Sequence, residues 1–122
     1  MLTNTHSVRY YHMIDGGEKK TNDFKEPLAP QNAKRIIRDI LENGILIFSS
    51  PHALDEMKKD NLTELDIVNV LRAGRVDEPE FEKGQFRYRF YSQKVVAIVS
   101  FRSLAKAIVV TAWKIKSRGK WR

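Results

Sequence analysis

Apolar residues follow a helical spacing in the first part of the chain and an alternating spacing after Gly74. In QNAKRIIRDILENG the apolar residues recur at the spacing of one side of a helix: Ile36, Ile37, Ile40 and Leu41. This spacing predicts a helix over about residues 31–42, closed by Gly44. A short apolar segment, ILIF, follows it.

Two further helices are predicted by their start signals. In SSPHALDEMKKDN, Ser50 as cap and a proline in the first helical position predict a helix over about residues 51–59. In NLTELDIVNVLRAG, Thr63 and Asp66 have the spacing of a capping box, and we expect Gly74 to end this third helix in a left-handed conformation. Residues 31–73 are therefore expected to be mainly helical.

The part of the chain after Gly74 predicts strands. The runs RVDEPEFE, QFRYRFYS, KVVAIVSF and KAIVVTAWK are joined by segments short enough for antiparallel hairpins, the first of them Lys83–Gly84. Pro79 marks the first run as an edge strand. Helices followed by strands predict an α+β fold, with N-terminal helices packed on one face of a C-terminal antiparallel sheet of about four strands over residues 76–114.

We expect a segment without a fixed fold on each side of this domain. We expect residues 1–29 to form a flexible N-terminal extension, 30–115 a single domain and 116–122 a basic C-terminal tail. Within the extension, SVRYYHMI is compatible with a strand or with a flexible segment. The chain has no cysteine, no apolar signal-like region at its start and no run of 18 apolar residues. These features predict a cytoplasmic protein without a membrane partner.

Alternation gives the predicted sheet two different faces. One face is apolar and is expected to pack against the helices, with Phe86, Tyr88, Phe90, Val95, Ala97, Val99, Phe101, Ile108, Val110 and Ala112. The other face carries cations and aromatic residues: Arg87, Arg89, Tyr91, Ser100, Arg102, Thr111 and Trp113. This composition suits phosphates and stacked bases, whereas the plainer alternative is an ordinary solvated sheet face.

The distribution of charge favours a polyanion partner. All 15 acidic residues lie at or before Glu82, together with 11 of the 22 Lys and Arg, so residues 1–82 carry −4 and the remainder carries +11. Such asymmetry is typical of proteins that bind nucleic acid. The alternative is a solvated basic face followed by a loose cationic tail.

The segments SSPHALDEMKKDNLTELDIVNVLRAGRV, RYRFY, VVAIVSFRS and IVVTAWK resemble a bacterial domain family with an HA motif and an RYR strand, grouped with the MqsR-like and RelE-like toxins of toxin–antitoxin systems. The resemblance covers about residues 46–114. It implies a barnase–EndoU–colicin–RelE-like fold and a metal-independent endoribonuclease that cleaves mRNA, with or without the ribosome. It also implies neutralisation by a small antitoxin, with the zinc-finger type as one option. Relatives commonly have arginine where Glu56 and Asp60 stand, and whether lysines of this helix replace that cationic grip is left open.

Cleavage of RNA without a metal needs a base, an acid and fixed positive charge. His52 in the first turn of the second helix is the first candidate for acid or base, and Glu56 lies four residues on, where it could orient His52 or act as the base. Arg87 and Arg89 are the candidates for binding the transition state, because guanidinium groups hold phosphate bidentately. The plainer alternative is that His52 caps the helix and Glu56 is solvated.

Other residues are candidates for RNA binding alone. They are Arg102, Trp113 as a base-stacking surface, Lys114, Lys59, and Tyr88, whose alternation favours the core instead. No metal site and no cofactor is predicted, because His6 and His12 have no recognisable partner ligands. The rival interpretation is a non-enzymatic nucleic-acid-binding or protein-interaction module, such as an antitoxin or regulator.

Overall fold

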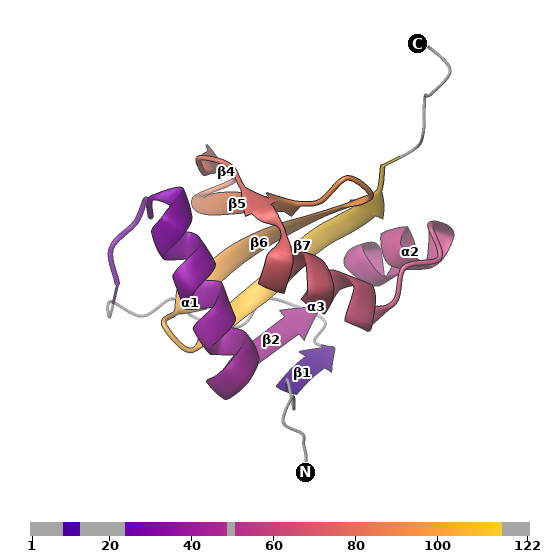
Figure 1. Ribbon diagram of the computed structural model, residues 1–122, viewed down its shortest axis with the longest axis horizontal. Coiled ribbons are helices and arrows are strands. Elements are labelled where there is room, and N and C mark those ends of the chain that lie inside the picture. The colour runs from indigo at the N-terminus through magenta and orange to yellow at the C-terminus, as the bar shows by residue number, and fades with distance from the viewer. Residues whose placement is uncertain (1–8, 13–23, 49–50, 116–122) are drawn as a thin grey trace.

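The structure, a computed structural model, describes residues 9–12, 24–48 and 51–115 (Figure 1). The helices in these ranges are α1 (Pro30–Asn43), α2 (Pro51–Lys59) and α3 (Glu64–Ala73). The strands are β1 (Arg9–His12), β2 (Ile45–Phe48), β3 (Arg75–Val76), β4 (Glu80–Glu82), β5 (Gln85–Tyr91), β6 (Val95–Ser103) and β7 (Lys106–Lys114). Within the same ranges, no helix is both long and apolar enough to cross a membrane.

The strands form one sheet in the order β1-β2-β7-β6-β5-β3, and β4 pairs with β5 beyond the end of β3. Strands β3 to β7 pair antiparallel, whereas β1 and β2 are parallel to each other and to β7. The predicted α+β class, with N-terminal helices followed by a largely antiparallel C-terminal sheet, is confirmed.

The sheet is larger than the predicted meander because two N-terminal strands extend it. The ILIF segment forms β2, in which Ile45 pairs with Lys106 of β7. Of the two alternatives for SVRYYHMI, the strand is the one found, since Arg9–His12 pairs with β2. Both pairings join residues far apart in sequence, so no local pattern predicts them.

The hydrophobic core lies between the helices and one face of the sheet. Helix α1 packs on α3, α3 packs on β5 and β6, and α2 packs on β7 (Figure 1). The predicted apolar stripe of α1 is buried, and it meets alternate residues of the central strands. The largest fully buried side chains include Phe48, Tyr88, Phe90 and Phe101.

The start of α3 is as predicted, but its end is not. Thr63 Oγ1 accepts a hydrogen bond from the Asp66 amide (3.1 Å) and Asp66 Oδ2 accepts one from the Thr63 amide (2.9 Å), which completes a capping box. The expected left-handed stop at Gly74 is wrong, because its φ is −79°. A Cβ at Gly74 would lie 2.5 Å from the carbonyl oxygen of Val70 and 2.6 Å from that of Tyr91, so close packing explains the glycine.

A bulge in β7 corrects the predicted faces of that strand. Residue pairing shifts between Ile98 and Val99 of β6, so that Ile98 pairs with Thr111 whereas Val99 pairs with Val109. Val110 is therefore an extra residue, and the core side of β7 carries Ala107, Val109 and Ala112. The assignment of Ile108 and Val110 to the helix-covered core was wrong, although Thr111 and Trp113 remain on the second face, as predicted.

The ordered domain begins before residue 30. Leu28 is buried in the core and Phe24 packs against it, with its ring 6.4 Å from that of Phe101. Residues 24–29, which we expected to belong to a flexible extension, therefore contribute to the fold, as does β1. The predicted basic tail at 116–122 lies outside the described residues.

Candidate functional site

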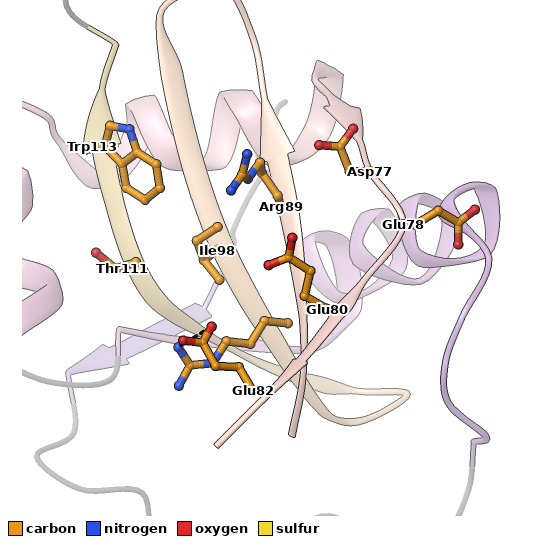
Figure 2. Close-up of a pocket in the computed structure, with 9 residues that line it drawn as sticks. Asp77, Glu78, Glu80, Glu82, Arg89, Ile98, Thr111 and Trp113 are labelled. Carbon is orange, nitrogen blue, oxygen red and sulfur yellow. Dashed lines mark ion pairs between the residues drawn. The ribbon is translucent and has the colours of Figure 1, made fainter. Parts of the chain in front are cut away.

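The sheet face opposite the helices carries a cavity of about 230 Å³ (Figure 2). Its walls come from β5, β6, β7, β4 and the segment between β3 and β4. They contain Asp77, Glu78, Glu80, Glu82, Arg87, Arg89, Ile98, Thr111 and Trp113. The two arginines and the tryptophan that the alternation pattern assigned to this face are thus brought together in one cavity.

A tight hairpin places the acidic residues beside the arginines. Lys83 and Gly84 both have positive φ values, 53° and 80°, as two-residue hairpin turns require. The turn sets the register in which Glu80 pairs with Arg87 and Glu82 with Gln85. Acidic and basic residues are separated along the sequence, but they are not separated in space. The last acidic residues, on β4, lie against the basic strand β5.

Arg87 is held in place by this hairpin. Its guanidinium lies 3.7 Å from Glu82 Oε1, and its side chain is 19% exposed compared with 54% for Glu82. The Arg87 Nε is buried and has no hydrogen-bond partner among the residues that the structure describes. A buried N–H without a partner is costly, so Arg87 is held in this position at an energetic cost.

Arg89 and Glu80 face the same cavity without pairing. Both residues are exposed, and neither side chain has a hydrogen bond or ion pair with another described residue. In Figure 2 the Arg89 guanidinium and the Trp113 indole lie on either side of Ile98, while the Glu80 carboxylate points toward Ile98 from the β4 side. A free cation, a free carboxylate and an aromatic wall thus surround one space.

Arg102 is part of a polar network next to the cavity rather than in its lining. Its Nη1 donates to Gln85 Oε1 (2.9 Å) and to Ser100 Oγ (2.8 Å). The Ser100 hydroxyl in turn donates to Gln85 Oε1 (2.8 Å), and Ser100 is 1% exposed. The network satisfies a buried polar residue on the sheet, which gives Arg102 a structural task.

The candidate residues of α2 lie elsewhere. Glu56 forms an ion pair with Lys59 (3.6 Å), and both line a separate surface cavity of about 510 Å³. His52 belongs to the first turn of α2, but its side chain lies outside what the structure describes. Lys114, at the end of β7, is exposed. Its backbone amide donates a hydrogen bond to Asp60 Oδ2 (2.7 Å), which connects the end of α2 to β7.

Tyr88 belongs to the core, so its place among the RNA contacts was wrong. It is fully buried, and its hydroxyl donates a hydrogen bond to Glu26 Oε2 (3.0 Å). The tyrosine hydroxyl oxygen also accepts a hydrogen bond from the Leu28 amide (2.9 Å). Burial raises the pKa of Tyr88 above its ordinary value, and the nearby Glu26 carboxylate adds to the rise. The neutral hydroxyl anchors residues 26–28 to the sheet and does not reach the second face.

The sequence analysis missed the carboxylates of this cavity. The sequence did contain the information needed to find them, because a hairpin turn at Lys83–Gly84 places the segment EFE opposite QFR.

Among the described residues, no group of three or more acidic or histidine side chains is arranged to hold a metal ion.

A family model described as "Domain of unknown function (DUF4258)" matches residues 49–114. The matched segment runs from just before α2 to the end of β7, so it contains every residue that lines the cavity. No curated protein and no solved structure shows significant similarity to the chain.

Proposed function

We propose that this chain, which belongs to the DUF4258 family, binds single-stranded RNA at the cavity of the second sheet face and cleaves it without a metal. The observation that carries the proposal is the meeting of Arg87, Arg89 and Trp113 in one cavity. The resemblance of the HA and RYR segments to ribonuclease toxins supports the same reaction.

The arginines suit two neighbouring phosphates. Residues two apart on one strand lie about 7 Å from each other, close to the spacing of adjacent phosphates on a single strand. Arg87, which the β4–β5 hairpin holds in the cavity, is the candidate for the scissile phosphate, and the exposed Arg89 is free to hold the next one. Trp113 offers a face on which a base can stack.

The proposed reaction is transesterification within the RNA. The 2′-hydroxyl attacks the neighbouring phosphorus, the P–O5′ bond breaks, and the products are a 2′,3′-cyclic phosphate and a free 5′-hydroxyl. Charge develops on the phosphoryl oxygens in the transition state, where preorganised guanidinium groups stabilise it. The leaving oxygen takes its proton from water or from an acid of the cavity, because α2, which carries His52, packs on the other face of the sheet.

The test is cleavage of a defined RNA by purified protein in EDTA, with the product ends identified. Arg89→Ala is expected to lower kcat/KM by about 10²–10³-fold while leaving the melting temperature unchanged. Lys94→Ala removes the same charge from the β5–β6 turn, outside the cavity, and should cleave like the parent. Equal cleavage by the Arg89 and Lys94 variants would contradict the proposed site, and RNA binding without cleavage would favour the non-enzymatic nucleic-acid-binding module.

In the cell, the proposed activity is that of a toxin in a type II toxin–antitoxin system, with mRNA as substrate and a small antitoxin protein as partner. Uncontrolled expression of the parent should arrest growth, and Arg89→Ala should relieve the arrest at equal protein level. Arrest that persists unchanged in this variant would separate toxicity from the cavity.

A further inference from the structure

We propose that Glu80 is the general base that accepts the 2′-hydroxyl proton. This inference rests on the proposed ribonuclease function and adds a catalytic residue to its site. It starts from an imbalance in the lining of the cavity, which has four acidic residues and two arginines. A surface that only bound RNA phosphates would gain nothing from those carboxylates, because they repel the ligand.

The first argument is the position of Glu80 on the sheet. It pairs directly with Arg87 across the β4–β5 hairpin, and directly opposed residues have Cβ atoms about 4.5–5.5 Å apart. A phosphate bound by Arg87 is therefore in the same cavity as the Glu80 carboxylate. The 2′-hydroxyl that attacks is adjacent to that phosphate, so its proton lies on the side where a base is needed.

The second argument is that Glu80 is the available carboxylate. Glu82 forms an ion pair with Arg87 (3.7 Å), and Glu78 points away from the cavity in Figure 2. Asp77 is positioned beside Arg89 by its backbone, whose amide donates to the Arg89 carbonyl (3.2 Å). Only Glu80 combines pairing with Arg87 and a carboxylate that is directed inward and has no partner among the described residues.

The third argument concerns the earlier candidates for the base. Glu56 forms an ion pair with Lys59 and lines a different cavity from the two arginines. A base on β4 therefore replaces Glu56 in the proposed site.

The reaction needs only the RNA, the Glu80 side chain and a proton donor. The O2′–P bond forms as the 2′-hydroxyl proton passes to the Glu80 carboxylate, and the P–O5′ bond breaks as O5′ takes a proton from an acid of the site or from water. Protonated Glu80 then loses its proton to solvent. No metal, oxidant or reductant enters the step.

The test compares Glu80→Gln with Glu42→Gln, which removes the same charge from an exposed position of α1, away from the cavity. Glu80→Gln should lower kcat by about 10²–10⁴-fold. It should bind uncleavable 2′-deoxy oligonucleotide at least as tightly as the parent, because a negative charge is gone. Glu42→Gln should cleave at the parental rate.

The pH dependence separates a base from a merely structural carboxylate. A base acts in its deprotonated form, so kcat/KM of the parent should fall at acidic pH as the base is protonated. Glu80→His should recover part of the activity lost in Glu80→Gln, with the acidic limb moved toward the ordinary imidazole pKa of about 6.5. A structural role would not move that limb.

The outcomes distinguish this inference from the function on which it rests. If Glu80→Gln cleaves like the parent while Arg89→Ala does not, Glu80 is not the base and the ribonuclease site stands. If the parent itself leaves RNA intact, both ideas fail. If Glu80→Gln melts well below the parent, the pH profile of kcat/KM in Glu80→His tests the proposal instead. If that variant folds and its acidic limb has not moved, the proposal is overturned.

Discussion

The three arginines on the second sheet face have different tasks because their surroundings differ. Arg102 donates to Gln85 and Ser100, Arg87 is half-buried against Glu82, and Arg89 is exposed without a partner among the described residues. Alternation along a strand predicts the face on which a side chain lies, but not what it contacts there. The difference separates an arginine that stabilises the fold from one that is free to bind a ligand.

We therefore expect opposite effects from two alanine substitutions. Arg102→Ala removes a donor to two polar side chains, one of them fully buried, and should lower the free energy of unfolding by about 1–3 kcal/mol. Arg89→Ala should change it by no more than about 0.5 kcal/mol, because the residue is exposed. Urea denaturation of both variants measures the contrast, and equal destabilisation would show that the Arg102 network contributes little.

Tyr88 allows a prediction on stability and pH. Tyr88→Phe leaves the buried Leu28 amide without its acceptor and should cost about 1–3 kcal/mol at neutral pH. Because the pKa of Tyr88 is raised in the folded state, its contribution is complete below the unfolded value of about 10 and is lost as pH rises above it, at up to about 1.4 kcal/mol per unit. The gap in unfolding free energy between parent and Tyr88→Phe should narrow above about pH 10. A gap that stays constant to higher pH would contradict the raised pKa.

At the scale of the elements, the sequence predicted what depends on neighbours along the chain. The stripe of α1, the cap of α3 and the Lys83–Gly84 hairpin all follow from spacings of a few residues, and all are present. The parallel strands β1 and β2 and the extra residue Val110 in β7 depend on partners far away in sequence, so no local spacing reveals them.

The same distinction applies to the candidate site. Its arginines and Trp113 followed from alternation, whereas its carboxylates required the hairpin register to be applied to the segment before the turn. Gly74 is a further case in which a distant residue decides. A glycine is needed there because the carbonyl of Tyr91 on a neighbouring strand leaves no room for a Cβ, and not because of its own backbone angle.

The cap of α3 provides a prediction at this scale. Thr63→Ala removes the acceptor for the Asp66 amide and should lower the free energy of unfolding by about 1 kcal/mol. Thr63→Ser keeps the oxygen and should retain most of the stability. Chemical denaturation of the two variants checks the capping box, and a Ser variant as unstable as the Ala variant would place the cause in the lost methyl group instead.

At the scale of the whole molecule, the +11 of the chain after Glu82 is partly offset where it meets the carboxylates of β4. A protein with a uniform basic surface would bind any polyanion, and its affinity would reflect net charge alone. A cavity whose lining combines two arginines with several acidic residues instead favours a ligand whose phosphates reach the arginines and avoid the acids. We therefore expect the geometry of the cavity to contribute to RNA binding beyond the total charge.

The last prediction tests that expectation through salt. Each phosphate neutralised on a single strand releases counterions, so log Kd should change with log salt concentration by about 0.7 per contact. Arg89→Ala should reduce the magnitude of this slope by about 0.7 on a short single-stranded RNA, whereas Lys94→Ala, with the same loss of net charge outside the cavity, should leave it near the parental value. Binding titrations between roughly 50 and 200 mM salt measure both slopes. If the two variants lower the slope equally, RNA responds to net charge and the cavity has no special part in binding. If the parental affinity does not change with salt at all, phosphate contacts do not hold the RNA, and the proposed use of the two arginines is wrong.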